Sequence, residues 1–327
     1  MRDLSPLIEI RGLTKRFARG RGLVAALVGK KPPIVHALNG VDLSVPRGET
    51  LAIVGESGCG KSTLARCLVR LQEADEGEIL YDGADARALE GQSRRDFNRC
   101  VQMVFQDPYG SLNPRQRIGS QLAEPIGVHG LRPAGEIPAR VRELLSMVGL
   151  PADAAARYPH AFSGGQRQRI GIARALALEP ECLIADEIVS ALDVSVQAQI
   201  INLLVALQQR LALTIIFVSH DLRLVRYIAH RVAVMYLGRV VEAGPTEAVF
   251  GDPRHPYTMA LMAAAPSLDF TRRETSDAVA GELPSPLAIP KGCAFHPRCP
   301  RAIERCRHEA PADRVAGEHR AACHLAA

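Results

Sequence analysis

Short apolar runs alternate with segments of helical periodicity from about residue 7 to residue 250. Four of the runs predict buried strands: Thr50–Val54, Val101–Phe105, Cys182–Asp186 and Thr214–Ser219. A helical or loop segment follows each run, an order typical of α/β proteins with a largely parallel central sheet. Residues 107–180 hold only loop and helix patterns. We therefore predict an α/β domain with a helical insertion at about 107–180.

The composition is that of an ordinary globular protein, with 47% hydrophobic and 23% charged residues. The formal net charge of +5 is too small to predict a nucleic-acid partner, because such partners require dense stripes of lysine and arginine. No run of about 18 apolar residues occurs, so the chain is not expected to span a membrane by itself. The N-terminus lacks the apolar segment of a secretory signal, so we expect a cytosolic location.

Three segments have the composition of accessory regions. Residues 18–34 form a basic insertion, interpreted as a surface loop, with a contact to lipid or a partner as the alternative. Residues 266–292 are rich in Pro, Ser and charge, which predicts a tether. Residues 293–327 carry four of the eight cysteines and are expected to form a small separate unit.

The most informative motif is a glycine-rich loop between strand Thr50–Val54 and a helix predicted from near Thr63. It matches the G-x-x-x-x-G-K-S phosphate loop, whose glycines let successive N–H groups face one centre at a helix N-terminus. We predict that Lys61 reaches the β- and γ-phosphates and that the Ser62 hydroxyl ligates Mg²⁺. The predicted nucleotide-binding residues of the loop are Gly55, Ser57, Gly58, Cys59, Gly60, Lys61, Ser62 and Thr63.

Phe17 is the only Phe, Tyr or Trp that precedes the phosphate loop. Two interpretations are open. We favour stacking on the adenine base, and the alternative is a plain core position.

The predicted strand Cys182–Asp186 ends in two successive carboxylates. Asp186 is placed to hold Mg²⁺, and Glu187 to polarise an attacking water, which are the two tasks that phosphoryl transfer asks of acidic side chains. The alternative is that both residues only terminate the strand.

A second anion-binding helix end is predicted at Ser163, Gly164, Gly165 and Gln166, before the apolar-periodic segment Ile170–Leu178. One chain does not need two phosphate cradles for one nucleotide, but two chains arranged head to tail do. The alternative is a simple helix cap.

These motifs together resemble those of ABC-type ATPases. Gln106, after strand Val101–Phe105, is similar to the family's Q-loop glutamine, Ser190-Ala191-Leu192-Asp193 to its D-loop, and His220 to its switch histidine. The resemblance covers about residues 7–250. It implies a P-loop ATPase fold with a mixed or parallel central sheet, an antiparallel β edge, a helical subdomain and a small C-terminal Cys-rich extension.

The resemblance also implies roles for these positions. Gln106 would contact the γ-phosphate and Mg²⁺, and Asp193 would lie at the nucleotide together with the Ser163–Gln166 turn. His220 would hydrogen-bond the γ-phosphate and hold Glu187 and the water in place. One departure is that Ile188 follows Glu187 where the family usually has proline. We expect an active ATPase that this change makes slower, and a regulator that binds ATP without hydrolysing it is the alternative.

Four segments narrow the resemblance to the F-type ATPases of dipeptide and oligopeptide permeases. They are Phe105–Pro114, Val189–Gln199, Pro253–Thr258 and Gly281–Pro286. The resemblance implies a D-type ATPase partner, two integral membrane permease subunits, an extracytoplasmic peptide-binding protein, and a peripheral position on the cytoplasmic face of the inner membrane. Alternatives are a related cargo, such as glutathione or a nickel chelate, and a soluble ABC ATPase outside transport. The predicted domains are 1–255 and an extension at 256–327.

The extension carries Cys293, Cys299, Cys306 and Cys323, without the C-x-x-C spacing of structural zinc sites. The family resemblance implies a 4Fe-4S cluster on these four thiolates. Zn²⁺ on four cysteines, or on a set that includes nearby histidines, remains the alternative, and disulfides come last in a reducing compartment. The histidines in question are His296, His308, His319 and His324. The remaining cysteines, Cys59, Cys67, Cys100 and Cys182, are interpreted as small apolar fillers.

Overall fold

The computed structural model describes residues 6–18, 33–107, 110–264 and 284–326. Nearly all of the predicted insertion at 18–34 and most of the predicted tether at 266–292 lie outside these residues. The chain forms two compact units. The first comprises Met1–Leu7, Val45–Thr50 and Ala88–Val218, and the second comprises Ile8–Ser44, Leu51–Arg87 and Ser219–Ala327.

The first unit is built on three parallel strands, β6 (Val101–Val104), β7 (Cys182–Asp186) and β8 (Thr214–Val218). β7 pairs with both neighbours, and Cys182 lies opposite Val101 on one side and Thr214 on the other. Every residue of β7 and β8 is buried, which explains why both strands are nearly continuous apolar runs in the sequence. The three strands confirm the predicted ones to within a residue.

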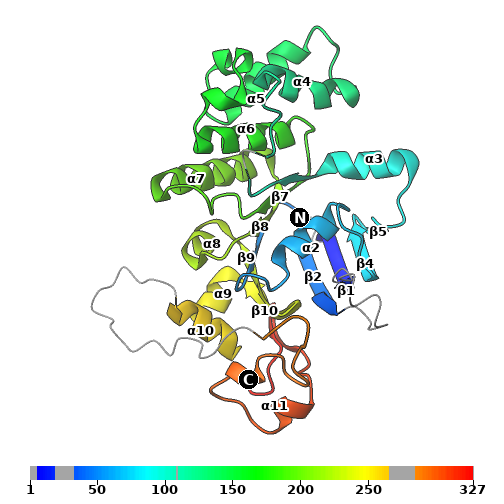
Figure 1. Ribbon diagram of the computed structural model, residues 1–327, viewed down its shortest axis with the longest axis vertical. Coiled ribbons are helices and arrows are strands. Elements are labelled where there is room, and N and C mark those ends of the chain that lie inside the picture. Colours follow the sequence, from blue (N-terminus) through cyan, green and yellow to red (C-terminus); the bar gives the residue numbers. More distant parts are fainter. Residues whose placement is uncertain (1–5, 19–32, 108–109, 265–283, 327) are drawn as a thin grey trace, which may run out of the picture. The chain divides into compact units, whose positions relative to one another are not determined.

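Helices make up most of the rest of residues Ala88–Val218 in the first unit (Figure 1). They are α3 (Gly91–Cys100), α4 (Ile118–Val128), α5 (Ile137–Met147), α6 (Gly164–Leu176) and α7 (Val194–Leu211), with short 3₁₀ turns at Ala152–Ala156 and Pro159–Ala161. α4, α5 and α6 pack against one another, and α6 also contacts α7. The described part of 107–180 is therefore helical, as predicted. α6 begins at Gly164, within the helix end predicted at Ser163–Gln166, and runs through most of the apolar-periodic segment to Leu176.

The second unit contains two sheets. In the first, β3 (Thr50–Val54) runs parallel to β9 (Arg231–Tyr236), which pairs antiparallel with β10 (Arg239–Pro245). The other is antiparallel, with the order β2-β1-β4-β5, and matches the predicted β edge. Its strands are β1 (Pro6–Ala18), β2 (Ile34–Pro46), β4 (Glu76–Tyr81) and β5 (Ala84–Asp85). The helices are α2 (Lys61–Leu68), α8 (Leu222–Ile228), α9 (Thr246–Gly251) and α10 (Pro256–Ala264).

The cysteine-bearing segment is joined to the second unit through a strand. β12 (His319–Ala321) pairs antiparallel with β10, so that Glu242 lies opposite Ala321, and β11 (Arg314–Ala316) adds beyond it. The segment otherwise holds one 3₁₀ turn, η3 (His296–Arg298), and one short helix, α11 (Arg305–His308). It therefore continues the sheet that also contains β3. Among the described residues, no helix combines the length and the apolar character that a bilayer crossing requires.

Candidate nucleotide site

The phosphate loop occupies the turn between β3 and α2 in the second unit, and two of its glycines are required by geometry. Gly55 has φ +149°, and a Cβ there would lie 2.2 Å from the Met235 carbonyl oxygen. Gly60 has φ +108°, and a Cβ there would lie 2.4 Å from the Ala37 carbonyl oxygen. Only glycine tolerates both the positive φ and the close approach of the backbone. The curl of the loop is thus set by its backbone.

Lys61 is fixed inside this curl. Its side chain is buried, and Nζ donates to the carbonyl oxygens of Gly55 (2.8 Å) and Glu56 (3.0 Å). α2 begins at Lys61, so Ser62 and Thr63 lie in its first turn, which has no acidic residue. A helix N-terminus and a held ammonium together form an anion site. Cys59 is buried, and burial raises the pKa of its thiol, as expected of a filler.

Sequence reasoning missed the role of Glu56, whose carboxylate is held from the C-terminal segment. Nη1 and Nη2 of Arg298 donate to its two oxygens at 2.8 and 2.9 Å. The hydrogen bonds to Glu56 raise the pKa of the Arg298 guanidinium. The Tyr257 hydroxyl accepts the backbone N–H of Glu56 at 2.9 Å. A carboxylate within a phosphate-binding loop is unexpected, and this feature of the sequence could have pointed to a partner for Glu56.

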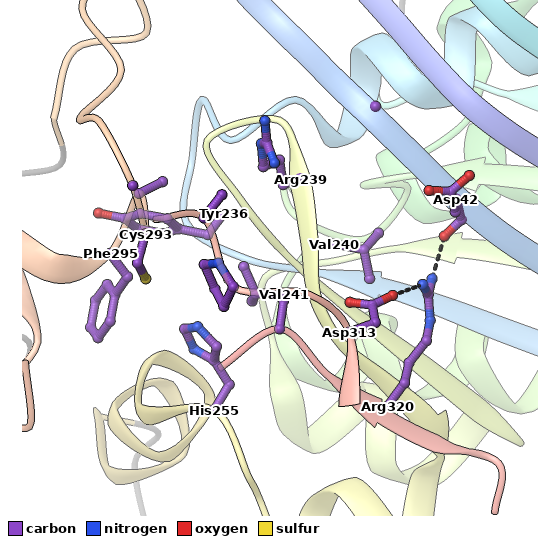
Figure 2. Close-up of a pocket in the computed structure, with 16 residues that line it drawn as sticks. Asp42, Tyr236, Arg239, Val240, Val241, His255, Cys293, Phe295, Asp313 and Arg320 are labelled. Atoms are coloured by element: carbon purple, nitrogen blue, oxygen red, sulfur yellow. Dashed lines mark hydrogen bonds and ion pairs between the residues drawn. The ribbon is translucent and has the colours of Figure 1, made fainter. Parts of the chain in front are cut away.

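The second unit also contains a cavity of about 300 Å³ where β9 and β10 meet the cysteine-bearing segment (Figure 2). Tyr236, His255 and Phe295 form its aromatic part, with ring centroids of Tyr236 and Phe295 5.3 Å apart. Arg320 donates to the Asp313 carboxylate and to the Asp42 carbonyl oxygen. These contacts fasten the C-terminal segment to the sheet.

His220 is the second residue after the end of β8, where the switch histidine was expected. It lines a cavity of about 350 Å³ together with Gly55, the first residue of the phosphate loop. Asp221, also on the cavity wall, caps α8 by accepting the Arg223 N–H. The hydrogen bond from the Arg223 side chain lowers the pKa of Asp221. The structure thus brings His220 and the phosphate loop to one cavity.

The two carboxylates lie in the first unit, at the end of β7. Asp186 is 3% exposed as the last residue of the strand. Glu187 has φ +48°, a conformation uncommon for a residue other than glycine, and its N–H donates to the Val218 carbonyl oxygen at 3.1 Å. The backbone therefore leaves the extended conformation of β7 at Glu187, immediately after Asp186. Local strain of this kind is often found at functional sites.

Gln106 meets Glu187 in this unit. Its Nε2 lies 3.3 Å from Oε2 of Glu187 and 3.2 Å from Oγ of Ser190. Ser190 in turn donates from Oγ to the Glu187 carbonyl oxygen at 2.9 Å. The Q-loop and D-loop residues predicted from sequence therefore converge on the predicted catalytic carboxylate.

Ile188, the departure from the family pattern, is 1% exposed, and Val189 is also buried. The turn after Glu187 is therefore anchored by apolar packing, where proline would restrict φ through its ring.

The Ser163 turn is a capping box at the start of α6. Oγ of Ser163 accepts the Gln166 N–H at 3.4 Å, and the Gln166 side chain accepts the Ser163 N–H at 3.0 Å. Ser163 and Gln166 are both exposed, whereas Gly165 is buried, and a Cβ there would lie 2.4 Å from Val196. Asp193 is exposed at the N-terminus of α7. The turn therefore presents its polar face to the surface of the unit.

Phe17 is half-buried near the end of β1, and the Lys15 ammonium lies 5.3 Å from its ring centroid. It is not a fully buried core residue. Stacking on adenine stays a prediction.

The four C-terminal cysteines interact with one another. Burial is the main reason that the pKa of Cys293 rises to about 11, and the charges of the other three thiols also raise it. The Leu325 N–H donates to Sγ of Cys323 at 3.4 Å. Burial likewise raises the pKa of Cys299, and the charges of Cys323 and Cys306 add to this shift.

No group of three or more His, Cys, Asp or Glu side chains in the described ranges has the geometry of a metal-ion site. All four histidines considered as alternative ligands hydrogen-bond other groups. Their partners are the Cys293 carbonyl oxygen for His296, Glu304 for His308, Glu242 for His319 and the Glu309 carbonyl oxygen for His324.

Comparison with known proteins agrees with this geometry. Residues 38–190 match the ABC transporter family, and residues 241–306 match the oligopeptide/dipeptide transporter C-terminal region. The chain is 51% identical to a probable peptide ABC transporter ATP-binding protein of Sinorhizobium fredii, covering 98% of this chain and 90% of that protein. It is 47% identical to the di/tripeptide transport ATP-binding protein DppF of Pseudomonas aeruginosa, covering 99% and 98%.

A solved structure is similar as well. The dimeric ATP-binding cassette MJ0796, bound to ADP and Pi in a post-hydrolysis state, superposes with a TM-score of 0.63 at 29% identity. The match covers 73% of this chain and 98% of that one. The fold and the phosphate loop define an ABC-type ATPase. The chain belongs to the ABC transporter family, in the branch that carries the oligopeptide/dipeptide transporter C-terminal region.

Proposed function

We propose that this chain is the ATP-hydrolysing subunit of a bacterial importer of dipeptides or oligopeptides. The observation that carries the proposal is that similarity to peptide-transport proteins continues through the C-terminal region. That region is the part of the chain in which a generic ABC ATPase would differ.

The residues of each unit have distinct roles in this proposal. Lys61 and the loop N–H groups bind the phosphates, and Phe17 stacks on the base. Glu187 accepts a proton from a water molecule while the oxygen of that water attacks the γ-phosphorus and ADP leaves. His220 and Gln106 position the reactants. Ser62, Asp186 and Gln106 would hold Mg²⁺, which would supply positive charge against the phosphates. Oxygen donors of this kind are those that Mg²⁺ prefers.

A second ATPase subunit completes the proposed assembly. The exposed polar face of the Ser163 turn, together with Asp193, suits a nucleotide held by a partner, and the cassette it superposes with is a dimer. We infer a D-type partner in a heterodimer, bound to two permease subunits at the cytoplasmic face of the inner membrane. An extracytoplasmic binding protein would deliver the peptide.

We also propose a 4Fe-4S cluster on Cys293, Cys299, Cys306 and Cys323. Its support is the family resemblance of the segment, the mutual influence of the four thiols on the pKa of Cys293, and the hydrogen bond that the Leu325 N–H donates to Sγ of Cys323, since hydrogen bonds to the sulfurs tune such clusters. Anaerobically purified protein should contain iron and sulfide and absorb near ~400 nm. Cys299→Ser should lower the iron content. A colourless protein with one zinc would contradict the cluster.

The transport proposal is tested by reconstitution. The chain would be co-expressed with its candidate permeases and binding protein, and ATP-driven uptake of a radiolabelled dipeptide into vesicles would be measured. Glu187→Gln should leave the complex assembled and abolish uptake. Failure to co-purify with the permeases, or uptake that survives Glu187→Gln, would contradict the proposal.

A further inference from the structure

Glu56 places a carboxylate inside a loop whose N–H groups and lysine are arranged for an anion. An unpaired carboxylate there would repel a bound triphosphate, because like charges disfavour one another at short range. The backbone N–H of Glu56 cannot offset this repulsion, because that N–H already donates to the Tyr257 hydroxyl. A neighbouring side chain must therefore neutralise the charge of Glu56.

Arg298 provides that neutralisation. The bidentate pair at 2.8 and 2.9 Å uses the planar fork of the guanidinium, which fixes the carboxylate in direction as well as in charge. The Arg298 side chain is 6% exposed and that of Glu56 27%, so solvent screens the pair less than it screens an open surface pair. The interaction therefore orients Glu56 firmly.

The segment that carries Arg298 is itself held in place. Arg298 ends the η3 turn, and Phe295, one residue before that turn, is buried against the rings of Tyr236 and Tyr257 at centroid distances of 5.3 and 5.4 Å. The Arg298 guanidinium also lies 5.9 Å from the centre of the Tyr236 ring. The labelled side chains of Tyr236, His255 and Phe295 are shown together in Figure 2. Arg298 therefore reaches the phosphate loop from a packed support.

We propose that Arg298 is a positioning residue for nucleotide binding, through which the C-terminal segment sets the affinity of the phosphate loop. Arg298 acts by neutralising the Glu56 carboxylate and by orienting it toward the guanidinium. The inference rests on the proposed role of residues 55–63 as the ATP site. It assigns to the peptide-transporter C-terminal region a direct effect on ATP binding.

The test is a double-mutant cycle on the full-length chain, with the Kd for MgATP measured by titration calorimetry. Arg298→Gln leaves Glu56 charged and unpaired, so binding should weaken about tenfold. Glu56→Gln removes the repelling charge and leaves Arg298 in place, so binding should stay within about threefold of wild type. The double variant should bind like Glu56→Gln, because without the carboxylate Arg298 has nothing to neutralise.

Three further variants make the result specific. Arg305→Gln removes an exposed ion pair to Glu309 in the same segment and should leave the Kd unchanged. Arg298→Lys keeps the charge but loses the bidentate geometry, so its Kd should be intermediate. Lys61→Ala tests the site itself and should weaken binding at least about tenfold, because a charged hydrogen-bond donor is lost.

The outcomes separate the two claims. Lys61→Ala binding like wild type would overturn the proposed ATP site, whatever Arg298 does. If Lys61→Ala loses binding but Arg298→Gln binds normally, the positioning role is wrong. A double variant as weak as Arg298→Gln would also contradict it, since the loss would then reflect structure and not the charge of Glu56. If Arg298→Gln does not fold, Arg298→Lys against Glu56→Gln gives the same comparison.

Discussion

The phosphate loop and the carboxylate end of β7 hold their side chains by different means. The loop depends on glycine backbone geometry at Gly55 and Gly60, and on a side chain from a distant part of the chain. At Glu187 the contacts are mostly closer in sequence: a buried strand before it, an apolar anchor after it, and hydrogen bonds to the neighbouring Ser190.

This difference suggests a division of tasks. A nucleotide-binding loop must present many N–H groups at once, which only an unusual backbone can do. A hydrolytic carboxylate must be aimed, which buried packing on either side achieves. Changes in the loop should therefore affect folding and binding together, whereas changes at the strand end should affect turnover most.

The largest expected effect separates binding from turnover. Glu187→Gln should lower the ATPase kcat about 100-fold or more, because the water loses its base, while the Kd for ATP stays near wild type. Lys61→Ala should instead weaken ATP binding at least about tenfold, as a charged hydrogen-bond donor is lost. Phosphate release and calorimetry measure the two. If Glu187→Gln lost ATP binding, the proposed separation between binding by the loop and turnover at Glu187 would be wrong.

Backbone dependence of the loop is tested by adding one methyl group. Gly55→Ala should lower the free energy of unfolding by about 3–4 kcal/mol, because its Cβ would clash with the Met235 carbonyl oxygen. Gly171→Ala in α6 is the matched control, since the nearest atom is 3.8 Å away, and it should be neutral or slightly stabilising. Urea unfolding of both variants provides the comparison. Equal stabilities would show that the loop can relax.

The apolar anchor at the strand end should matter for both stability and turnover. Ile188→Ala removes a side chain that is 1% exposed, so the free energy of unfolding should fall by about 2–3 kcal/mol. The ATPase kcat should fall while the Kd for ATP is kept, because Glu187 loses its support.

Ile188→Pro sharpens the same point. If burial already fixes the turn, the proline that the family pattern usually has here would add little, and kcat should stay near that of wild type. A clear rise in kcat would instead show that Ile188 slows this enzyme.

The smallest effect concerns acid stability of the second unit. Burial lowers the pKa of His255 from 6.5 to about 4. Between those values the unfolded chain binds a proton that the folded chain does not, so stability is full above pH 6.5 and falls as the pH drops. The loss between pH 6.5 and 5 should be about 1.5 kcal/mol. His255→Gln should flatten this dependence, and an unchanged slope would contradict the assignment.

Much of the fold could be predicted because its central strands are buried on both faces. β3 and β7 were predicted with their observed bounds, since continuous apolar runs flanked by motif residues leave little ambiguity. The start of α6 was predicted as well, because Ser163, Gly164, Gly165 and Gln166 were recognised as a helix end, and α6 begins at Gly164 with Ser163 as its N-cap.

The site could be predicted only as far as local motifs reach. Lys61, Asp186 and Glu187 follow from the residues beside them. The φ of +48° at Glu187 does not, because no glycine marks it. The pair between Glu56 and Arg298 spans 242 positions, and no periodicity or spacing connects them. Strands β11 and β12 are three residues each, too short to give a pattern.

The ion pair between Glu56 and Arg298 also orders events during synthesis. Arg298 leaves the ribosome 242 residues after Glu56. A nascent chain that has not yet reached Arg298 therefore carries the phosphate motif without its Arg298 contact. Synthesis through Arg298 is thus a condition for the mature form of the loop.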